Sequence, residues 1–208
     1  FVVGAVLSGV AAVMTLMILM RYMFKLHNYI WEEHIDAVTR LLIVVAFGWH
    51  FLFWLEIVFA FWAQEPAELA VWQLRLFTAP WSWLFLAFYA FSFVIPVSLW
   101  FFRGIRRNMA VMFVLSLLVN VGMWLERLII IVPGLMHKGP MTFDYTSYRP
   151  SVVELTIVVG TFALVGFLLL MFSKFFPLIP IWEAKEGVIL KEEIKVGNVN
   201  VPAIVKED

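Results

Sequence analysis

The residues best placed to do chemistry lie in an apolar run from Asn120 to Pro133, which contains an adjacent acid and base, Glu126 and Arg127. Hydrocarbon solvates neither charge, and an ionisable side chain within a membrane segment is costly unless it is paired or faces a cavity. Asn120 and Arg127 are seven residues apart, nearly two helical turns, so they share a helix face with Trp124 between them. Glu126 points at least a quarter-turn away from Arg127, so the two need not be partners.

Each charge of this pair has two interpretations. Arg127 lies about five residues before the end of its predicted span, roughly 7–8 Å from the membrane boundary. Its side chain either extends to the lipid headgroups or donates a hydrogen bond to a polar ligand head group, such as a quinone carbonyl or hydroxyl. Glu126 is either a proton acceptor or a structural partner for another helix.

Composition indicates a membrane protein. Of the 208 residues, 63% are hydrophobic and 14% are charged, whereas a soluble domain is nearer half apolar and a quarter charged. The formal net charge is zero, which gives no support for a nucleic-acid partner. The chain contains no cysteine, so it can itself hold neither an iron–sulfur cluster nor a disulfide, and we expect no metal in it.

Five apolar segments are long enough to cross a bilayer, which predicts an all-α fold, a polytopic transmembrane helical bundle. The spans cover about residues 1–20, 41–61, 81–102, 109–132 and 152–172. The bundle then occupies residues 1–182, and a polar tail follows at 183–208, where residues 188–205 partly alternate and predict a short hairpin. The sequence begins inside an apolar run with no initiator Met, so we expect it to be the later part of a longer protein.

Other features of the sequence predict local structure. Residues 27–36 are too charged to span and predict an interfacial segment, while residues 64–68 predict an acidic loop. Pro96 predicts a kink in the third span. Small residues at helical spacing in the first span predict a close helix contact; they are Gly4, Ala5, Ser8, Gly9, Ala11 and Ala12. Tryptophans near span ends are typical of interface anchors; they are Trp31, Trp62, Trp72, Trp81, Trp83, Trp100 and Trp182.

Basic residues near the span ends predict the orientation. One side carries Arg21, Lys25, Arg40, Arg103, Arg106, Arg107 and Lys174, and the other carries only Arg75, Lys138 and Arg149. The first side should therefore be cytoplasmic. Five spans then start outside and finish with the C-terminal tail in the cytoplasm.

Other polar residues lie elsewhere in the spans. His50 and Glu56 are six residues apart and point to different helix faces, so one site does not use both. A lone histidine in a helix is more often a hydrogen-bonded core residue than a ligand, and we expect no haem within this chain, because haem ligation across a bundle needs paired histidines. Near the cytoplasmic edge, Glu32, Glu33, His34 and Asp36 form either a solvated turn or the mouth of a proton path that rises to Glu56 or Glu126.

Several segments resemble the NrfD-like family of integral membrane subunits of polysulfide-reductase type, and within it the quinol-oxidising membrane subunit of bacterial alternative complex III. The most specific segment is Val119–Arg127. The others are Ser8-Gly9, Tyr29-Ile30 with His34-Ile35-Asp36, Arg75 with Ala79-Pro80-Trp81, Tyr148-Arg149-Pro150-Ser151 and Phe176–Glu183. Together they cover most of residues 1–185 in the order found in the family.

The resemblance implies a quinol-binding subunit of a respiratory electron-transfer complex in the bacterial cytoplasmic (inner) membrane, built from two helical bundles. It would bind menaquinol or ubiquinol near the outer face and pass electrons to an iron–sulfur cluster subunit, beside a paralogous NrfD-like membrane subunit and c-type cytochrome subunits. Arg127, with Asn120 and Trp124 on its face, would belong to the quinol pocket. His34, Asp36, Glu56 and Glu126 would be candidates for proton conduction. We assign no catalytic residue within this chain.

Two other functions remain open at this point. Polar groups at several depths and the proline in the third span are compatible with an ion or solute transporter, although no internal repeat supports one. A structural membrane anchor without a quinone site is the other alternative.

Overall fold

The computed structural model describes residues 1–27, 29–136, 150–176, 193–196 and 199–202. These residues contain five helices that are long and apolar enough to cross a membrane. This confirms the predicted fold class, an all-α polytopic membrane protein. The chain divides into two units, residues 1–148 and residues 149–208.

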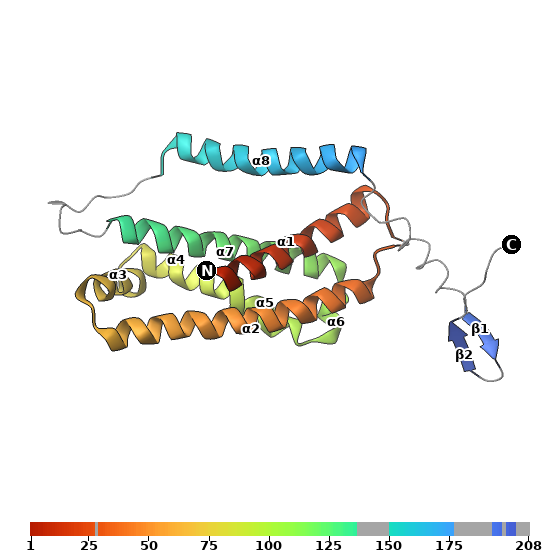
Figure 1. The fold of residues 1–208 in the computed structure, drawn as a ribbon, viewed down its shortest axis with the longest axis horizontal. Helices are drawn as coiled ribbons and strands as arrows, with labels where there is room; N and C mark the ends of the chain where they lie inside the picture. Colours follow the sequence, from red (N-terminus) through yellow and green to blue (C-terminus); the bar gives the residue numbers. More distant parts are fainter. Residues whose placement is uncertain (28, 137–149, 177–192, 197–198, 203–208) are drawn as a thin grey trace. The chain divides into compact units, whose positions relative to one another are not determined.

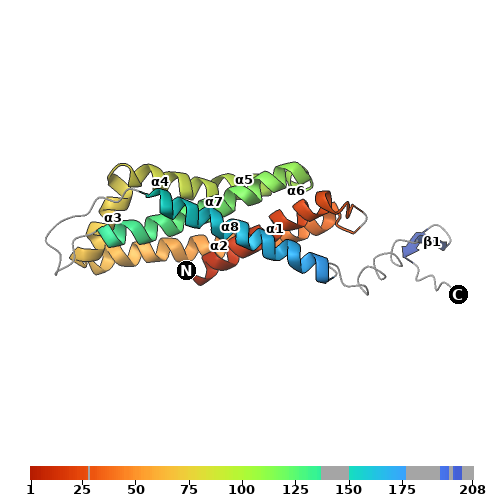
Figure 2. The same ribbon diagram turned by 90° about the horizontal axis from the view of Figure 1, so that it is seen from above.

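The first unit is a helical bundle. Its elements are α1 (Val2–Met23), α2 (Glu32–Ala63), α3 (Pro66–Phe77), α4 (Trp81–Tyr89), the π-helical segment η1 (Ala90–Val94), α5 (Ile95–Trp100), α6 (Arg103–Arg106) and α7 (Met109–Met136). Helix α7 packs between α1 and a rod formed by α4, η1 and α5, and α1 also packs against α2 (Figures 1 and 2). The short helix α3 lies at one end of the bundle, and α6 lies at the other.

The bundle packs through buried stripes that recur every three or four residues, the period of a helix face. Helix α7 contributes Met112, Leu115, Val119, Gly122, Met123, Glu126 and Ile129 to the buried interior. Helix α1 contributes Gly4, Leu7, Ala11, Met14 and Ile18. The predicted small-residue contact therefore uses Gly4 and Ala11, whereas nothing lies within 4 Å of a side chain placed at Gly9.

Two segments that the sequence predicted to be non-spanning connections, residues 27–36 and 64–68, run into helices. Residues Glu32 to Asp36 are not a separate interfacial segment but the start of α2, where acidic side chains favour the positive end of the helix dipole. At about 48 Å this 32-residue helix exceeds the roughly 30 Å hydrocarbon core, so its ends protrude. The acidic loop leads into α3, a helix that the sequence interpretation missed although Pro66 stands at a first-turn position that proline favours.

The irregularity expected at Pro96 lies one turn earlier. The chain widens into the π-helical segment η1 immediately before Pro96, whose ring would clash with the carbonyl of Ser92 in a regular α-helix. Helix α7 approaches this widened turn closely at Gly122. A Cβ atom at Gly122 would lie 2.7 Å from the backbone nitrogen of Ser92 and 3.0 Å from the carbonyl carbon of Phe91.

Two further expectations are corrected. Trp72, Trp81 and Trp100 are buried inside the bundle and are not interface anchors, whereas Trp62 and Trp83 are exposed. Helix α7 continues through Pro133 to Met136 rather than ending at residue 132. Arg127 therefore lies nine residues before the helix end, about 13–14 Å along its axis.

In the second unit, α8 (Val152–Phe175) begins with a capping box. Ser151 N–H donates to Glu154 Oε2 at 2.9 Å, and Glu154 N–H donates to Ser151 Oγ at 3.2 Å. Strands β1 (Glu193–Val196) and β2 (Val199–Pro202) pair antiparallel, with Glu193 opposite Pro202, which confirms the predicted hairpin. The loop over residues 137–149 and most of the motif over residues 176–183 lie outside the described residues.

Substituting Gly122 with alanine should destabilise the bundle by about 1–3 kcal/mol, because the added methyl group meets backbone atoms of η1 that cannot rotate away. The unfolding temperature of the detergent-solubilised protein, followed by circular dichroism, measures this. Gly9→Ala in α1 is the matched control, since its methyl group enters open space. Equal unfolding temperatures for the two variants would show that α7 does not depend on this close approach.

Candidate functional site

Glu126 is a carboxylate buried between α1, α2 and α7. Its side chain is 6% exposed. The indole Nε1 of Trp49, on the buried face of α2, donates a 3.2 Å hydrogen bond to Glu126 Oε1. The second oxygen, Oε2, accepts no hydrogen bond within the described residues and lies 3.5 Å from Arg127 Nη2. The carboxylate of Glu126 is therefore hydrogen bonded through Oε1, whereas Oε2 could still accept a hydrogen bond.

Arg127 lies beside this carboxylate and reaches the surface of the bundle. Its side chain is 26% exposed. The guanidinium donates a long, 3.4 Å hydrogen bond to the backbone carbonyl of Phe1 and lies 4.3 Å from the centroid of the Phe1 ring. Glu126 and Arg127, which helical spacing alone did not require to be partners, thus form an ion pair, and Arg127 Nη2 lies where α1 passes at Gly4.

Gly4 makes this arrangement possible. A Cβ atom at Gly4 would lie 3.1 Å from Arg127 Nη2, 3.1 Å from Trp49 Nε1 and 3.0 Å from Met123 Cε. The absence of a side chain lets α1 cover the hydrogen bond between Trp49 and Glu126. We call Trp49, Glu126 and Arg127, with Gly4 over them, the Glu126 site.

A second arginine lies nearby at the same end of the bundle. Arg75 in α3 donates a 3.0 Å hydrogen bond to the backbone carbonyl of Ile130, one turn beyond Glu126 on α7. Burial lowers the pKa of the Arg75 guanidinium, while the charges of Glu56 and Glu68 raise it. Two carboxylates of the spans, Glu56 and Glu126, thus share this end of the bundle with two guanidiniums.

Asn120 and Trp124 do not join Arg127 through any hydrogen bond within the described residues. Asn120 Nδ2 donates to the Ser116 carbonyl at 3.0 Å, within α7. Ser116 in turn accepts a 2.9 Å hydrogen bond from Thr15 of α1. Trp124 is 44% exposed on the outer surface of α7.

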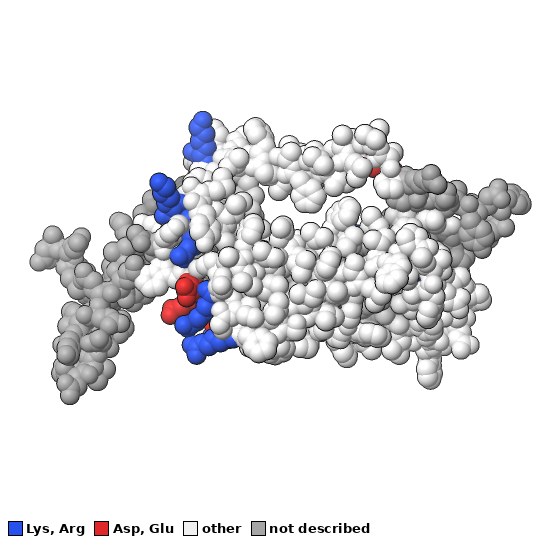
Figure 3. Space-filling view, turned by 180° about the vertical axis from the view of Figure 1, so that it is seen from behind, with Lys and Arg blue, Asp and Glu red and all other residues white. Residues whose placement is uncertain are grey.

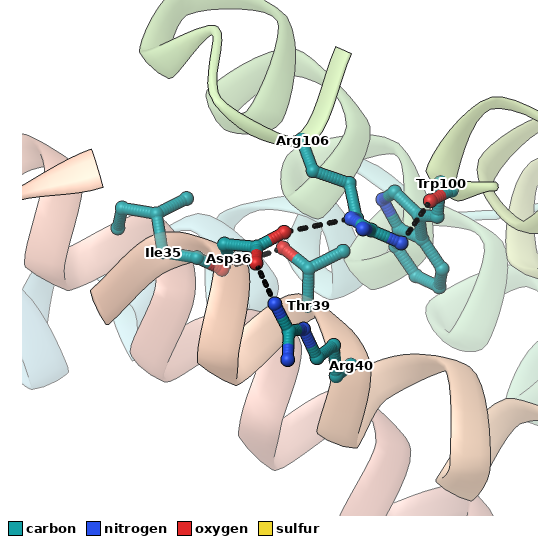
Figure 4. Close-up of polar contacts among 6 residues, drawn as sticks. All are labelled: Ile35, Asp36, Thr39, Arg40, Trp100 and Arg106. Atoms are coloured by element: carbon teal, nitrogen blue, oxygen red, sulfur yellow. Dashed lines mark hydrogen bonds and ion pairs between the residues drawn. The ribbon is translucent and has the colours of Figure 1, made fainter. Parts of the chain in front are cut away.

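His34 and Asp36 lie at the opposite end of the bundle, about 30 Å from Glu56 along α2. Asp36 is buried and pairs with two arginines: Arg40 Nη2 lies 2.5 Å from its Oδ2, and Arg106 Nε lies 2.7 Å from its Oδ1 (Figure 4). Arg106 also donates to the Trp100 carbonyl at 3.2 Å. His34 Nδ1 accepts the Trp31 N–H at 3.1 Å and so caps α2.

This end also carries most of the surface charge. On the face shown in Figure 3, the charged side chains of the first unit gather at one end of that unit. The residues at this end are Arg21, Lys25, Glu32, Glu33, Arg40, Arg103, Arg106 and Arg107. The predicted asymmetry of basic residues is therefore visible in the fold of the first unit.

His50 is hydrogen bonded, as expected for a lone histidine in a helix. Its Nδ1 lies 3.0 Å from Tyr89 Oη, which also accepts a 3.0 Å hydrogen bond from Trp54 Nε1. The imidazole stacks on Phe93 at 3.9 Å between ring centroids. Within the described residues, no group of three or more His, Cys, Asp or Glu side chains could hold a metal ion.

Sequence reasoning missed the partners of these groups. Trp49, Tyr89 and Arg106 each satisfy a polar residue that the sequence singled out, but each is far from its partner along the chain. The one available signal for Trp49 was its place on the apolar stripe of α2, four residues before Phe53. That stripe predicts burial and does not reveal which polar group the indole meets.

Replacing Trp49 with phenylalanine should destabilise the protein by at least about 1–3 kcal/mol, because Glu126 Oε1 loses its donor and the smaller ring leaves part of the buried indole volume empty. Trp83→Phe, at an exposed position, is the matched control. Circular dichroism during heating measures both variants. The same unfolding temperature in both would mean that the indole does not stabilise the carboxylate.

Replacing Asp36 with asparagine should destabilise the protein by a similar amount, about 1–3 kcal/mol, because Arg106 loses its anionic partner. Glu33→Gln, on the exposed side of the same turn, should have little effect. Thermal unfolding distinguishes a structural role from a role in proton transfer. Impaired proton uptake with an unchanged unfolding temperature would contradict the structural role.

Comparison with known proteins agrees with this architecture. The protein-family model described as "Polysulphide reductase, NrfD" matches residues 1–138, about two thirds of the chain. No curated protein matches the chain. The family contains membrane subunits of quinol-linked oxidoreductases, and its members partner with iron–sulfur subunits. The chain, with its five apolar helices, belongs to the NrfD polysulphide reductase family of multi-pass membrane proteins.

Proposed function

We propose that this chain is a quinol-binding membrane subunit of a respiratory electron-transfer complex of the alternative complex III type. The observation that carries the proposal is the partly exposed Arg127 guanidinium beside the buried Glu126 carboxylate. Both groups lie in an apolar helix of a family of quinol-linked oxidoreductase subunits.

The chemistry of the donor set is compatible with a quinol. A quinol supplies two electrons and two protons, and its ring carries oxygens that accept and donate hydrogen bonds. Arg127 is a donor with part of its surface outside the bundle, and Glu126 Oε2, which lies 3.5 Å from Arg127 Nη2, accepts no hydrogen bond from the described residues. In the proposal Arg127 holds a ring oxygen, and Asn120 and Trp124 line the same side of α7.

Electrons leave to an iron–sulfur cluster in a partner subunit, since this chain has no cysteine to hold one. A paralogous membrane subunit and c-type cytochromes complete the proposed complex. The quinone is menaquinone or ubiquinone. The complex lies in the bacterial cytoplasmic membrane, with the basic end of the bundle and the C-terminal tail facing the cytoplasm.

Of the four candidates for proton conduction, Glu126 has the surroundings that suit proton transfer best, because it is buried and its Oε2 accepts no hydrogen bond from the described residues. Asp36 is held by two arginines, which favours a structural role. His34 caps α2 at an exposed position, and Glu56 lies on the outer surface of the bundle.

The test is quinol oxidation by the purified complex carrying Arg127→Ala or Arg127→Lys. Loss of a charge-assisted hydrogen bond of about 1.5–3 kcal/mol should lower turnover by roughly tenfold or more. Lysine keeps the charge but not the planar fork, so its effect should be smaller. Arg103→Ala, at an exposed position of the other end, should leave turnover unchanged.

Subunit composition of each variant complex is checked by native electrophoresis, so that a failure of assembly is not mistaken for a failure of binding. Wild-type turnover in Arg127→Ala would remove this residue from the quinol site. Absence of bound quinone, together with no labelling of the chain by an azidoquinone, would instead favour the structural anchor.

A further inference from the structure

Glu56 occupies a position that the bundle does not explain. It lies in α2 within an uninterrupted apolar stretch, with residues 51–55 before it and residues 57–62 after it. Trp62 is exposed at the end of this stretch, where tryptophan is typical of the membrane interface. Glu56 lies six residues before Trp62, about 9 Å deeper along the helix.

The carboxylate of Glu56 faces outward from the bundle. Glu56 is exposed, and no described residue hydrogen-bonds to it or forms an ion pair with it. Arg75 interacts with it only at a distance and is itself buried, with its Nη2 committed to the Ile130 carbonyl. An acidic side chain in a membrane segment nearly always faces protein or water and has a partner. Contact with lipid alone therefore does not explain an exposed carboxylate at this position of α2.

The neighbours of Glu56 on α2 form a surface suited to another helix. Gly48, Leu52, Glu56 and Phe59 lie three or four residues apart and so share one side of α2. We call these four residues the Glu56 stripe. Gly48 is exposed and its nearest neighbour, Val3 Cγ1, would be 3.9 Å from an added Cβ, so another backbone can approach there. Leu52 and Phe59 are 49% and 65% exposed.

We propose that the Glu56 stripe binds a transmembrane helix of another membrane subunit, and that this helix carries a basic side chain paired with Glu56. Charge complementarity identifies the occupant, because a desolvated carboxylate needs a cation or a strong donor beside it.

This interface is separate from the proposed quinol site, because the stripe contains none of the residues of the Glu126 site. The chain also offers a matched pair of positions for testing it. Phe59 lies on the stripe, whereas Phe51 is equally exposed on another side of α2. The photoreactive amino acid benzoylphenylalanine replaces either residue with little change in shape.

The experiment places benzoylphenylalanine at Phe59 or at Phe51 in the complete complex in native membranes. Irradiated complexes are digested, and the peptide attached to each probe is sequenced by mass spectrometry. The probe at Phe59 should attach to a transmembrane segment of another subunit that contains Lys, Arg or His. The probe at Phe51 should give lipid adducts or adducts to a different segment.

Glu56→Lys in the Phe59 probe background should lower the yield of this adduct by about tenfold or more, because like charges would then face each other. Glu56→Gln keeps the shape and should have a smaller effect. Replacing the partner's basic residue with Glu should restore the adduct in the Glu56→Lys background. The Phe51 adducts report whether the helix itself is still correctly inserted.

Several results would overturn the proposal. These are adducts at Phe59 to lipid alone, to α8 or another segment of the same chain, or to a helix without a basic residue. An unchanged adduct yield in Glu56→Lys would have the same meaning, since the charge would then play no part in the contact. Quinol oxidation is not the readout, so failure of the interface and failure of the proposed quinol site are distinguishable.

Discussion

The structure depends on how an apolar bundle accommodates charges that hydrocarbon cannot solvate. At one end, Asp36 is neutralised by two arginines that come from its own helix and from α6. At the other end, Glu126 is held by the Trp49 indole and lies beside Arg127. Each arrangement joins segments that are far apart in the sequence. The compensation of buried charge therefore also fixes which helices meet.

Close backbone approach is the second constraint, and it is met where a residue has no side chain. Gly4 lets α1 cover the contact between Trp49 and Glu126, and Gly122 lets α7 approach the widened turn η1. The π-helical turn η1 ends at Val94, two residues before Pro96, and Gly122 of α7 packs against Phe91 and Ser92 within it. The proline, the glycine and the contact between α7 and η1 therefore occur at the same place in the bundle. Larger residues at either glycine would separate the helices that hold the charged groups.

The two ends of the bundle consequently differ in character. The end formed by α6 and the start of α2 carries many charges at its surface and one closed ion-pair network, which is typical of a solvated membrane boundary. Among the described residues at the end near α3, Arg75 and Glu126 are buried and Arg127 is partly exposed, while Glu56, Glu65 and Glu68 face outward. Buried polar atoms that lack a hydrogen bond within the described residues occur at both ends: Glu126 Oε2 and Arg75 Nε at this end, and Arg21 Nε and Trp100 Nε1 at the other.

The sequence alone determined the class of protein, the five apolar helices, the hairpin near the C-terminus and the residues worth examining, because hydropathy and helical spacing act locally along the chain. It did not predict α3, whose amphipathic twelve residues are too short and too polar to stand out as a span. Nor did it reveal that Trp49 donates a hydrogen bond to Glu126, that Trp72, Trp81 and Trp100 are buried, or that Asp36 is paired with Arg106. Only the tertiary structure decided these points, because side-chain partners separated by tens of residues meet through helix packing, which no local pattern encodes.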